Sequence, residues 1–230
     1  MPSGCTKSFV VAIDGPSGVG KSTAAARLAQ AIGFHYAQSG AMYRAVGWLV
    51  ASSGVHQRDS HRIAALLAES RIQIALRPGE ATVRVNGRDV SAELAGEAVG
   101  GAASAVAALP EVRQGVTAEL RRLRREGNLV MEGRDIGTVV FPDADVKFFL
   151  DASLDVRARR RWREMRQAGD DGTLGEVRLA VARRDDQDRS RSLAPLVPAR
   201  DAQVIDTSDF SIDDVVRTML SGSQHIITAG

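Results

Sequence analysis

The sequence predicts an α/β fold with a parallel sheet that is interrupted by a small antiparallel β insertion. Apolar strand-like runs alternate with helix-like segments along most of the chain, which is the order of a doubly wound parallel sheet. One stretch instead alternates polar and apolar residues, which is typical of antiparallel strands. The length of 230 residues is enough for one sizeable domain with an insertion.

The elements follow in chain order. The first predicted strand, 8–13, contains a continuous apolar run typical of a strand buried on both faces, and the helix predicted over 21–32 consists of strong helix formers. Pro110 suits the first turn of its helix, and Gly127 ends that helix. Residues after Leu220 are expected to be loosely ordered. The other strands are predicted at 34–37, 128–132, 145–150 and 202–206, and the other helices at 41–53, 98–108, 110–126, 153–168, 174–188 and 211–221.

A β insertion is predicted where the alternation of strands and helices breaks. Segments 71–76 and 81–85 both have a period of two, and Asn86-Gly87 follows the second of them. This combination indicates an antiparallel hairpin. A substrate-side subdomain and a hairpin without a functional role are equally compatible with the pattern.

The composition is that of an ordinary globular protein, with 44% hydrophobic and 25% charged residues. The net charge of +2 argues against general nucleic-acid binding. The sequence shows neither an apolar run that could span a bilayer nor a signal-peptide pattern, so no membrane partner is expected. The lone cysteine, Cys5, cannot form an internal disulfide, which favours a reducing cytoplasm.

A glycine-rich loop joins the first strand to the first helix and fits the pattern G-x-x-x-x-G-K-[S/T]. Its glycines let several backbone N–H groups point at one anion, and the helix N-terminus adds partial positive charge. The lysine reaches the β- and γ-phosphates of a nucleotide, and the last hydroxyl can bind Mg²⁺. A glycine-rich turn with a chance lysine is the alternative. The loop consists of Gly15, Pro16, Ser17, Gly18, Val19, Gly20, Lys21 and Ser22.

Two polar clusters follow other predicted strands. Ser39 comes after the second strand, and Arg44 lies about one helical turn farther on. Glu132 ends an apolar strand as a Mg²⁺-supporting acid would, and Arg134-Asp135 follows in a glycine-flanked turn. Since ligands bind at the carboxyl ends of parallel strands, both clusters are candidate site residues. A plain loop and a structural ion pair are the respective alternatives.

A third cluster lies in the arginine- and aspartate-rich segment 157–191. On one continuous helix Arg184, Asp188 and Arg191 would share a face at positions i, i+4 and i+7. Such a face could bind a phosphate and a sugar hydroxyl together, or could be an ordinary ladder of intrahelical salt bridges. The whole segment is either a solvated charged face or a hinged arginine lid.

Taken together, these stretches resemble bacterial cytidylate kinases, of the nucleoside monophosphate kinase group of P-loop NTPases. The resemblance covers nearly the whole chain in family order, and the stretch that begins at Gly133 is its most specific part. The matching segments are 13–22, 39–44, 102–104 with 110–113, 133–142, 149–153, and 184–189 with 194–196.

The resemblance implies a three-layer P-loop NTPase core, an antiparallel insertion that binds the monophosphate, and a helical lid. It implies transfer of phosphate from ATP to CMP or dCMP by a monomer. It divides the chain into a core (8–62, 98–152 and 195–221), an insertion (about 63–97) and a lid (about 153–194).

The resemblance also implies roles for individual residues. Lys21, Arg44 and Arg134 would be catalytic, and Mg²⁺ would be bound by Ser22 and, through water, by Glu132. ATP would contact residues 15–22, Thr23 and, as weaker candidates, Arg157 and Arg161. CMP would contact Ser39, Arg44, Ser104, Arg113, Arg134, Asp135, Arg184, Asp188 and Arg191.

Two positions depart from the family pattern. Gln38 stands where an aspartate is frequent, and Glu132 where aspartate is common. Gln38 keeps hydrogen-bonding capacity without the charge, so a metal or arginine contact at that position is in doubt. Two other functions share part of this pattern. A shikimate-type kinase would need an acid near the acceptor hydroxyl, and a GTP switch would carry an Asn-Lys-x-Asp motif that the sequence lacks.

Overall fold

The computed structural model describes residues 8–57, 59–77 and 80–228. Cys5 lies outside these residues. The chain forms two compact units. The first comprises Gly33–Leu129 with the N-terminal segment that ends at Phe9, and the second comprises Val10–Ile32 with Val130–Gly230. The division into core, insertion and lid remains a prediction.

The central sheet has five strands in the order β2-β6-β1-β7-β8. The pairings of β1 with β7 and of β7 with β8 are parallel, which confirms the predicted sheet. β1 lies in the middle with later strands on both sides, so its carboxyl end marks a point where the strand order reverses and ligands usually bind. The strands are β1 (Val10–Asp14), β2 (His35–Gln38), β6 (Leu129–Glu132), β7 (Val146–Asp151) and β8 (Gln203–Asp206).

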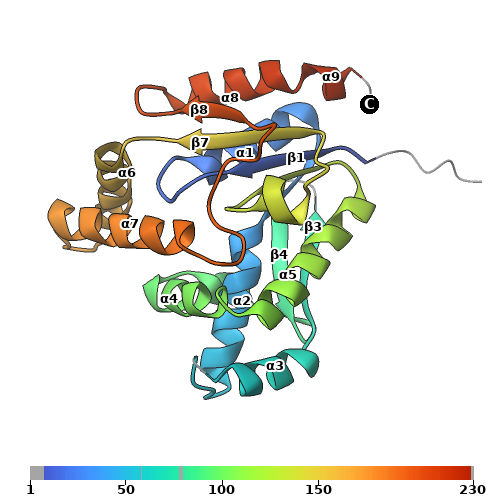
Figure 1. Cartoon of the computed structure of the whole chain (residues 1–230), viewed down its shortest axis with the longest axis vertical. Helices are drawn as coiled ribbons and strands as arrows, with labels where there is room; N and C mark the ends of the chain where they lie inside the picture. The colour runs from blue at the N-terminus through green and yellow to red at the C-terminus, as the bar shows by residue number, and fades with distance from the viewer. Residues whose placement is uncertain (1–7, 58, 78–79, 229–230) are drawn as a thin grey trace, which may run out of the picture. The chain divides into compact units, whose positions relative to one another are not determined.

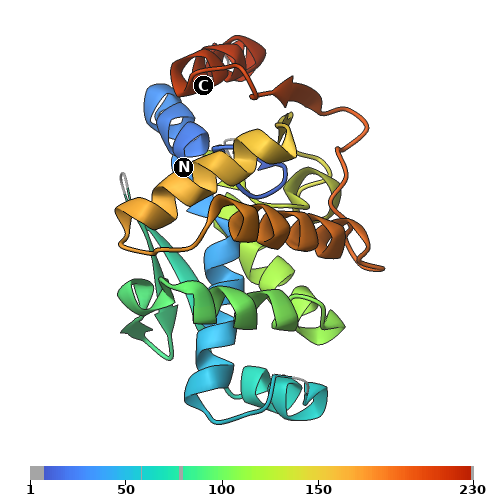
Figure 2. The ribbon, with the colours of Figure 1, turned by 90° about the vertical axis from the view of Figure 1, so that its left-hand side faces the viewer.

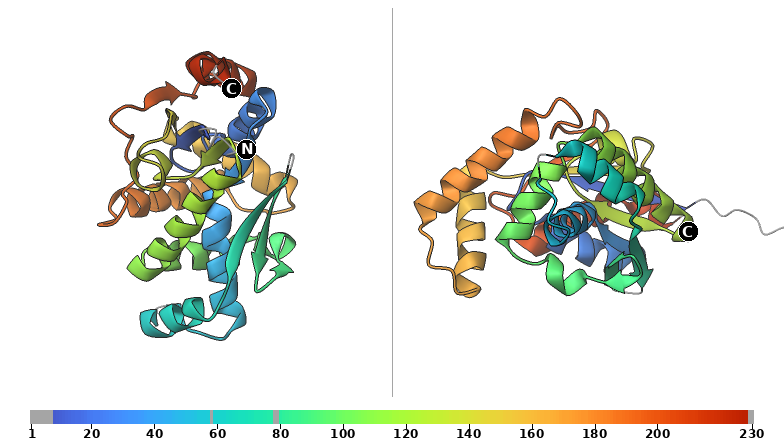
Figure 3. Two further views of the ribbon diagram at one scale, coloured as in Figure 1. Left: turned by 90° about the vertical axis from the view of Figure 1, so that its right-hand side faces the viewer. Right: turned by 90° about the horizontal axis from the view of Figure 1, so that it is seen from below.

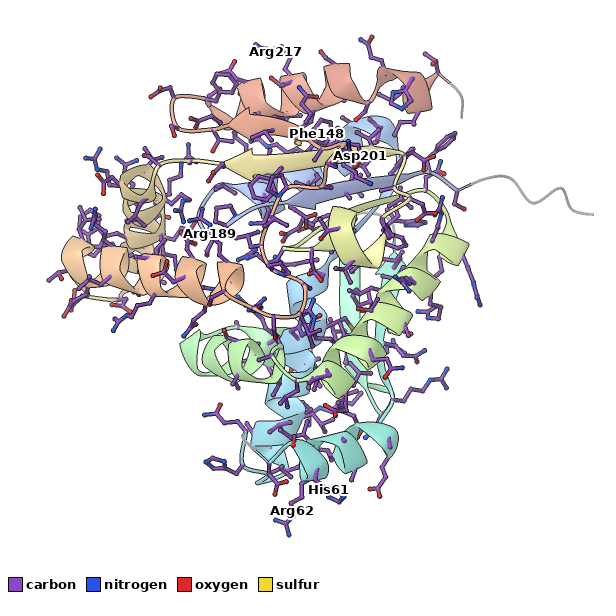
Figure 4. All side chains as sticks on the ribbon, in the orientation of Figure 1. His61, Arg62, Phe148, Arg189, Asp201 and Arg217 are labelled. Atoms are coloured by element: carbon purple, nitrogen blue, oxygen red, sulfur yellow. The ribbon has the colours of Figure 1, made fainter. Side chains whose placement is uncertain are left out.

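The helices of the second unit pack in pairs. α6 packs against α7, and α1 against α8 (Figures 1 and 2). Phe148 on β7 is buried next to α8 (Figure 4), and a Cβ atom on Gly222 would lie 3.0 Å from its ring. The elements are α1 (Lys21–Ile32), the π-helix η3 (Ile136–Val140), α6 (Leu154–Gln167), α7 (Leu174–Arg189), α8 (Ile212–Gly222) and α9 (Gln224–Ile227).

The helix ends of this unit follow local capping rules. The Ser153 side chain accepts a hydrogen bond from the Val156 N–H at the start of α6. Thr173 with Glu176 and Ser211 with Asp214 form capping boxes at the starts of α7 and α8. Each cap satisfies backbone N–H groups that have no partner within the helix.

The first unit contains the predicted antiparallel sheet, with strand order β3-β4-β5 (Figure 3). Asn86 and Gly87, at φ 51° and 84°, form the turn between β4 and β5, as expected for an Asn-Gly pair. Gly47 allows α2 and α4 to approach closely, because a Cβ there would lie 2.8 Å from the Ala103 nitrogen. The elements are α2 (Ser39–Ser52), α3 (Ser60–Ala68), β3 (Ile72–Arg77), β4 (Glu80–Val85), β5 (Arg88–Asp89), η1 (Ser91–Leu94), α4 (Glu97–Val106), α5 (Pro110–Arg122) and η2 (Leu123–Glu126).

Two expectations are wrong. Within the described residues, the segment after Leu220 forms the end of α8 and then α9, because Ile226 is buried and fixes it. Residues 133–137 do not form one simple tight turn, since 133–135 form a bend and Ile136 and Gly137 already belong to the π-helix η3. α3 was not predicted, and the 110–126 helix divides into α5 and η2. No described helix combines the length and apolar character that a membrane crossing needs.

Candidate active site

In the loop between β1 and α1, only glycine fits the backbone at positions 15 and 18. Gly15 has φ 146°, and a Cβ there would lie 2.0 Å from the Leu150 carbonyl oxygen. Gly18 has φ 83°, and a Cβ there would lie 3.0 Å from the Arg157 carbonyl oxygen. The loop therefore lies directly against the end of β7 and the start of α6. Thr23 follows in the first turn of α1 and is exposed.

Lys21 lies buried at the start of α1, with its Nζ donating a hydrogen bond of 2.6 Å to the Pro16 carbonyl. Burial, and secondly the charge of Arg134, lower the pKa of Lys21 to about 7, while Glu132 and Asp14 act in the opposite direction. Taking an ammonium out of water is costly unless anions surround it. A bound anion would stabilise the charged form of Lys21. This favours the predicted role of Lys21 in binding phosphates.

Ser22 and Glu132, the two predicted Mg²⁺ residues, lie together in the structure. The Ser22 hydroxyl donates a hydrogen bond of 2.9 Å to Glu132 Oε1. A hydroxyl and a carboxylate fit Mg²⁺, which is usually bound by one or two protein oxygens, by waters and by substrate phosphates. Among the described residues there is no group of three or more His, Cys, Asp or Glu side chains that could hold a metal ion.

Arg134, Asp188 and Arg191 form one ion-paired cluster. Arg134 Nε lies 3.0 Å from Asp188 Oδ2, and Arg191 lies 2.6 Å from Asp188 Oδ1. The expected continuous helix face is wrong, because α7 ends at Arg189. Arg191 instead reaches Asp188 from the segment after the helix. One buried carboxylate thus holds two guanidinium groups, which is a suitable arrangement for binding an anion.

Asp135 is buried between Arg134 and η3, and Asp14 at the end of β1 supports the same turn. Asp14 accepts hydrogen bonds from the backbone N–H groups of Ile136 (2.8 Å) and Gly137 (2.7 Å). Sequence reasoning missed Asp14, although an acid directly after a buried apolar strand is a recognisable signal. Burial is the main cause that raises its pKa to about 6, and the two backbone hydrogen bonds oppose that rise.

The raised pKa of Asp14 predicts a pH-dependent contribution to stability. Its pKa rises from 3.8 to about 6 on folding, so its stabilising contribution is complete below the unfolded value and is lost as pH rises through the folded value. We expect the free energy of unfolding of the wild type, relative to Asp14→Asn, to fall between about pH 4 and pH 6. Urea unfolding of both proteins across this range measures the difference, and a constant or rising difference would contradict the prediction.

The other lid residues have different surroundings. Arg157 is buried, pairs with Asp185 at 2.6 Å and donates to the Ser17 carbonyl at 3.3 Å. Arg161 is exposed and pairs with Glu164 on the same helix, at 3.2 Å. Arg184 lies exposed on α7.

Arg160 was not singled out from the sequence, yet it lies at the phosphate loop. It donates to the Thr207 side chain and carbonyl, at 3.0 and 2.6 Å. Thr207 in turn donates to the carbonyl of Val19, at 3.3 Å. These contacts stabilise the outer part of the loop. Because Val19 and Thr207 are 188 residues apart, no local sequence pattern could have predicted the contact between them.

In the first unit the structure brings some of the predicted acceptor residues together. Arg113 is buried on α5, with its guanidinium carbon 5.7 Å from the centre of the Tyr43 ring on α2. Arg44, one residue farther along α2, donates a long hydrogen bond of 3.4 Å to the Leu94 carbonyl. Ser39 is buried at the start of α2, and Ser104 lies half-buried on α4. These side chains come from helices that pack against each other.

Comparison with known proteins identifies the family. The family described as cytidylate kinase matches residues 11–225. Relatives named cytidylate kinase are 42% identical in Shouchella clausii (93% of this chain, 95% of the relative) and 43% identical in Methylococcus capsulatus (92% and 95%). A crystal structure of an uncharacterized protein from Eubacterium ventriosum has a similar fold, with a TM-score of 0.53 at 12% identity, covering 94% of this chain and 97% of that one. The chain therefore belongs to the cytidylate kinase family.

Proposed function

We propose that this protein is an ATP:(d)CMP phosphotransferase, which transfers the γ-phosphate of ATP to CMP or dCMP and yields ADP with CDP or dCDP. Family membership supports the proposal. The observation that carries it is the placement of two cations: Lys21 lies buried in the glycine-rich loop with Nζ 2.6 Å from the Pro16 carbonyl, and Arg134 is held by the buried Asp188 at 3.0 Å. Two cations beside a glycine-rich loop are what a reaction between two phosphates requires.

The donor and acceptor sites are assigned as the resemblance implies. The glycine-rich loop (15–22) and Thr23 bind the ATP phosphates, with Arg157 and Arg161 as further candidates. Arg44 and Arg134 hold the phosphate of the acceptor. The other acceptor residues are Ser39, Ser104, Arg113, Asp135, Arg184, Asp188 and Arg191.

The reaction needs charge neutralisation more than proton transfer. An oxygen of the CMP phosphate attacks the γ-phosphorus of ATP, and the bond from that phosphorus to the β–γ bridging oxygen breaks, so ADP leaves. The attacking oxygen is already ionised, so no general base is required. Lys21 and Arg134 offset the repulsion between the two anionic groups, and their fixed position makes this stabilisation effective in the transition state.

Ser22, and Glu132 through water, would hold Mg²⁺ together with ATP. The ion would supply further neutralisation of charge on the β- and γ-phosphates. The hydrogen bond between Ser22 and Glu132 supports this assignment. We further propose that the protein works as a monomer in the cytoplasm, on small-molecule substrates alone.

An acceptor panel tests the proposed activity. ADP release is measured with ATP and, in turn, CMP, dCMP, UMP, AMP and shikimate. We expect the fastest release with CMP or dCMP. If ADP formed at the same rate with and without every acceptor, the protein would be an ATPase and the proposal would fail.

Replacing Asp135 by alanine is expected to relax the choice of base. A carboxylate accepts a hydrogen bond from the exocyclic amine of cytosine, whereas uracil presents a carbonyl oxygen at that position. We expect the ratio of kcat/KM for CMP to that for UMP to fall by about 10- to 100-fold, with a smaller change in ATP affinity. Asp213→Ala, on the exposed face of α8, is the control. Equal losses for ATP and CMP would argue against base reading by Asp135.

A further inference from the structure

Both carboxylate oxygens of Asp14 accept hydrogen bonds from the backbone of one segment that is distant in the sequence, Ile136–Gly137. Oδ1 accepts from the N–H of Ile136 at 2.8 Å, and Oδ2 accepts from the N–H of Gly137 at 2.7 Å. The side chain is only 3% exposed, so water does not replace these bonds readily. A buried carboxylate stays ionised only where such donors converge on it. The end of β1 and the first turn of η3 are therefore joined at a fixed distance.

The segment that Asp14 holds begins directly after Arg134 and Asp135. The two residues whose N–H groups it binds are the first of η3, and the Asp135 carbonyl accepts from Val139 and Val140, which closes the π-helical turn. The peptide groups on both sides of Ile136, the first of which includes the Asp135 carbonyl, are thus held within one hydrogen-bonded unit. A displacement of Ile136 would move Asp135 and, through it, Arg134.

Lys147 also packs against the same segment, next to Asp14. A Cβ atom on Gly137 would lie 3.2 Å from Lys147 Cδ and 3.4 Å from Asp14 Oδ2, so Gly137 has little room to move. Lys147 Nζ donates to the Pro142 carbonyl at 2.6 Å and to Asp201 at 2.9 Å. Gly137 of η3 therefore packs against both Asp14 and the stem of a buried lysine.

We infer that Asp14 is a positioning residue for Arg134 and Asp135, acting on the acceptor half of the reaction through the backbone of Ile136 and Gly137. This inference deepens the proposed function and rests on it. The competing role is support of the phosphate loop, because Gly15 follows Asp14 directly. The two roles differ in which nucleotide a change at Asp14 affects.

Asp14→Asn is the first test. The amide keeps one acceptor oxygen but turns an NH₂ group toward the second backbone N–H, so one hydrogen bond is replaced by a repulsive contact. We expect kcat with CMP to fall and KM for CMP to rise, together lowering kcat/KM about 10- to 100-fold. The dissociation constant for ATP, measured without acceptor, should change less than about threefold. Backbone amides of Ile136 and Gly137 should exchange hydrogen faster, while those of residues 15–20 keep their protection.

Gly137→Ala reaches the same segment without altering the residue next to the loop. The added methyl group must displace either η3 or Lys147, so it should reproduce the loss toward CMP with ATP binding retained. Asp145→Asn is the matched control. Asp145 also accepts from a backbone N–H, that of Val10 at 2.9 Å, but at the opposite end of β1. Its kinetic constants are expected to equal those of the wild type.

The outcomes separate the inference from the proposed function. An equal loss of ATP and CMP binding in Asp14→Asn would assign Asp14 to the phosphate loop and overturn the inference. Unchanged CMP kinetics in both Asp14→Asn and Gly137→Ala would overturn it as well. If the wild type itself showed no CMP-dependent ADP release, the proposed function would fail, and hydrogen exchange would still report whether Asp14 fixes the segment. Should Asp14→Asn not fold, Gly137→Ala decides alone.

Discussion

Replacing Arg134 by alanine is expected to lower turnover with CMP by about 10³-fold, with a smaller effect on ATP binding. The guanidinium lies in the same cluster as the buried carboxylate of Asp188, and its charge reaches Lys21. As proposed, it holds the acceptor phosphate and offsets the charge that accumulates between the two nucleotides. A fixed cation in a partly buried site stabilises the transition state more than the ground state, because negative charge is most concentrated between the two phosphates in the transition state. Steady-state kinetics with varied CMP and ATP measure the effect.

Two controls separate lost chemistry from lost structure. Arg217→Ala removes an exposed arginine of α8 whose pairing with Asp214 is local (Figure 4), and its kinetics should not change. Arg134→Lys keeps a positive charge without the planar fork, so it should retain more turnover than alanine. Full activity in Arg134→Ala, with a normally folded protein, would remove Arg134 from the proposed site.

The fold could be predicted mainly where local sequence determines local structure. β1 and β7 are mostly apolar, and both are buried along nearly their whole length in the parallel sheet. The alternation in β3 and β4 correctly indicated antiparallel pairing. α3 could also have been predicted, because Asp59 caps it by accepting from the Arg62 N–H. That signal was present in the sequence and was missed.

Other features depend on residues far apart in the chain. η3 begins at two N–H groups held by Asp14, which lies 122 residues away from the nearer one, so 133–141 alone could not show a π-helix. The position of Arg191 depends on the end of α7 and on Asp188, which already binds Arg134. Periodicity placed Arg191 on a helix face, whereas the structure places it in the following segment. For the candidate site, the sequence could predict which residues take part, but it could not predict which of their side chains contact one another.

Replacing Asp185 by asparagine is expected to destabilise the protein by about 3–5 kcal/mol. Asp185 on α7 and Arg157 on α6 form an ion pair of 2.6 Å in which both side chains are about 5% exposed or less. Arg157 also donates to the carbonyls of Ala152 and Ser17. Loss of the carboxylate charge leaves the guanidinium buried without a counterion, and the remaining backbone acceptors do not carry a full charge. Urea unfolding of the two proteins measures the difference.

The same two helices provide a matched control. Asp155 on α6 pairs with Arg178 on α7 at 2.7 Å, but both side chains are at least half exposed. Water and salt screen that pair, so Asp155→Asn should leave the unfolding midpoint nearly unchanged. Burial alone therefore distinguishes two ion pairs that join the same elements. If Asp185→Asn unfolded at the same urea concentration as Asp155→Asn, the energy of desolvating Arg157 would already be offset by its carbonyl partners, and Asp185 would not be needed to hold α6 against α7.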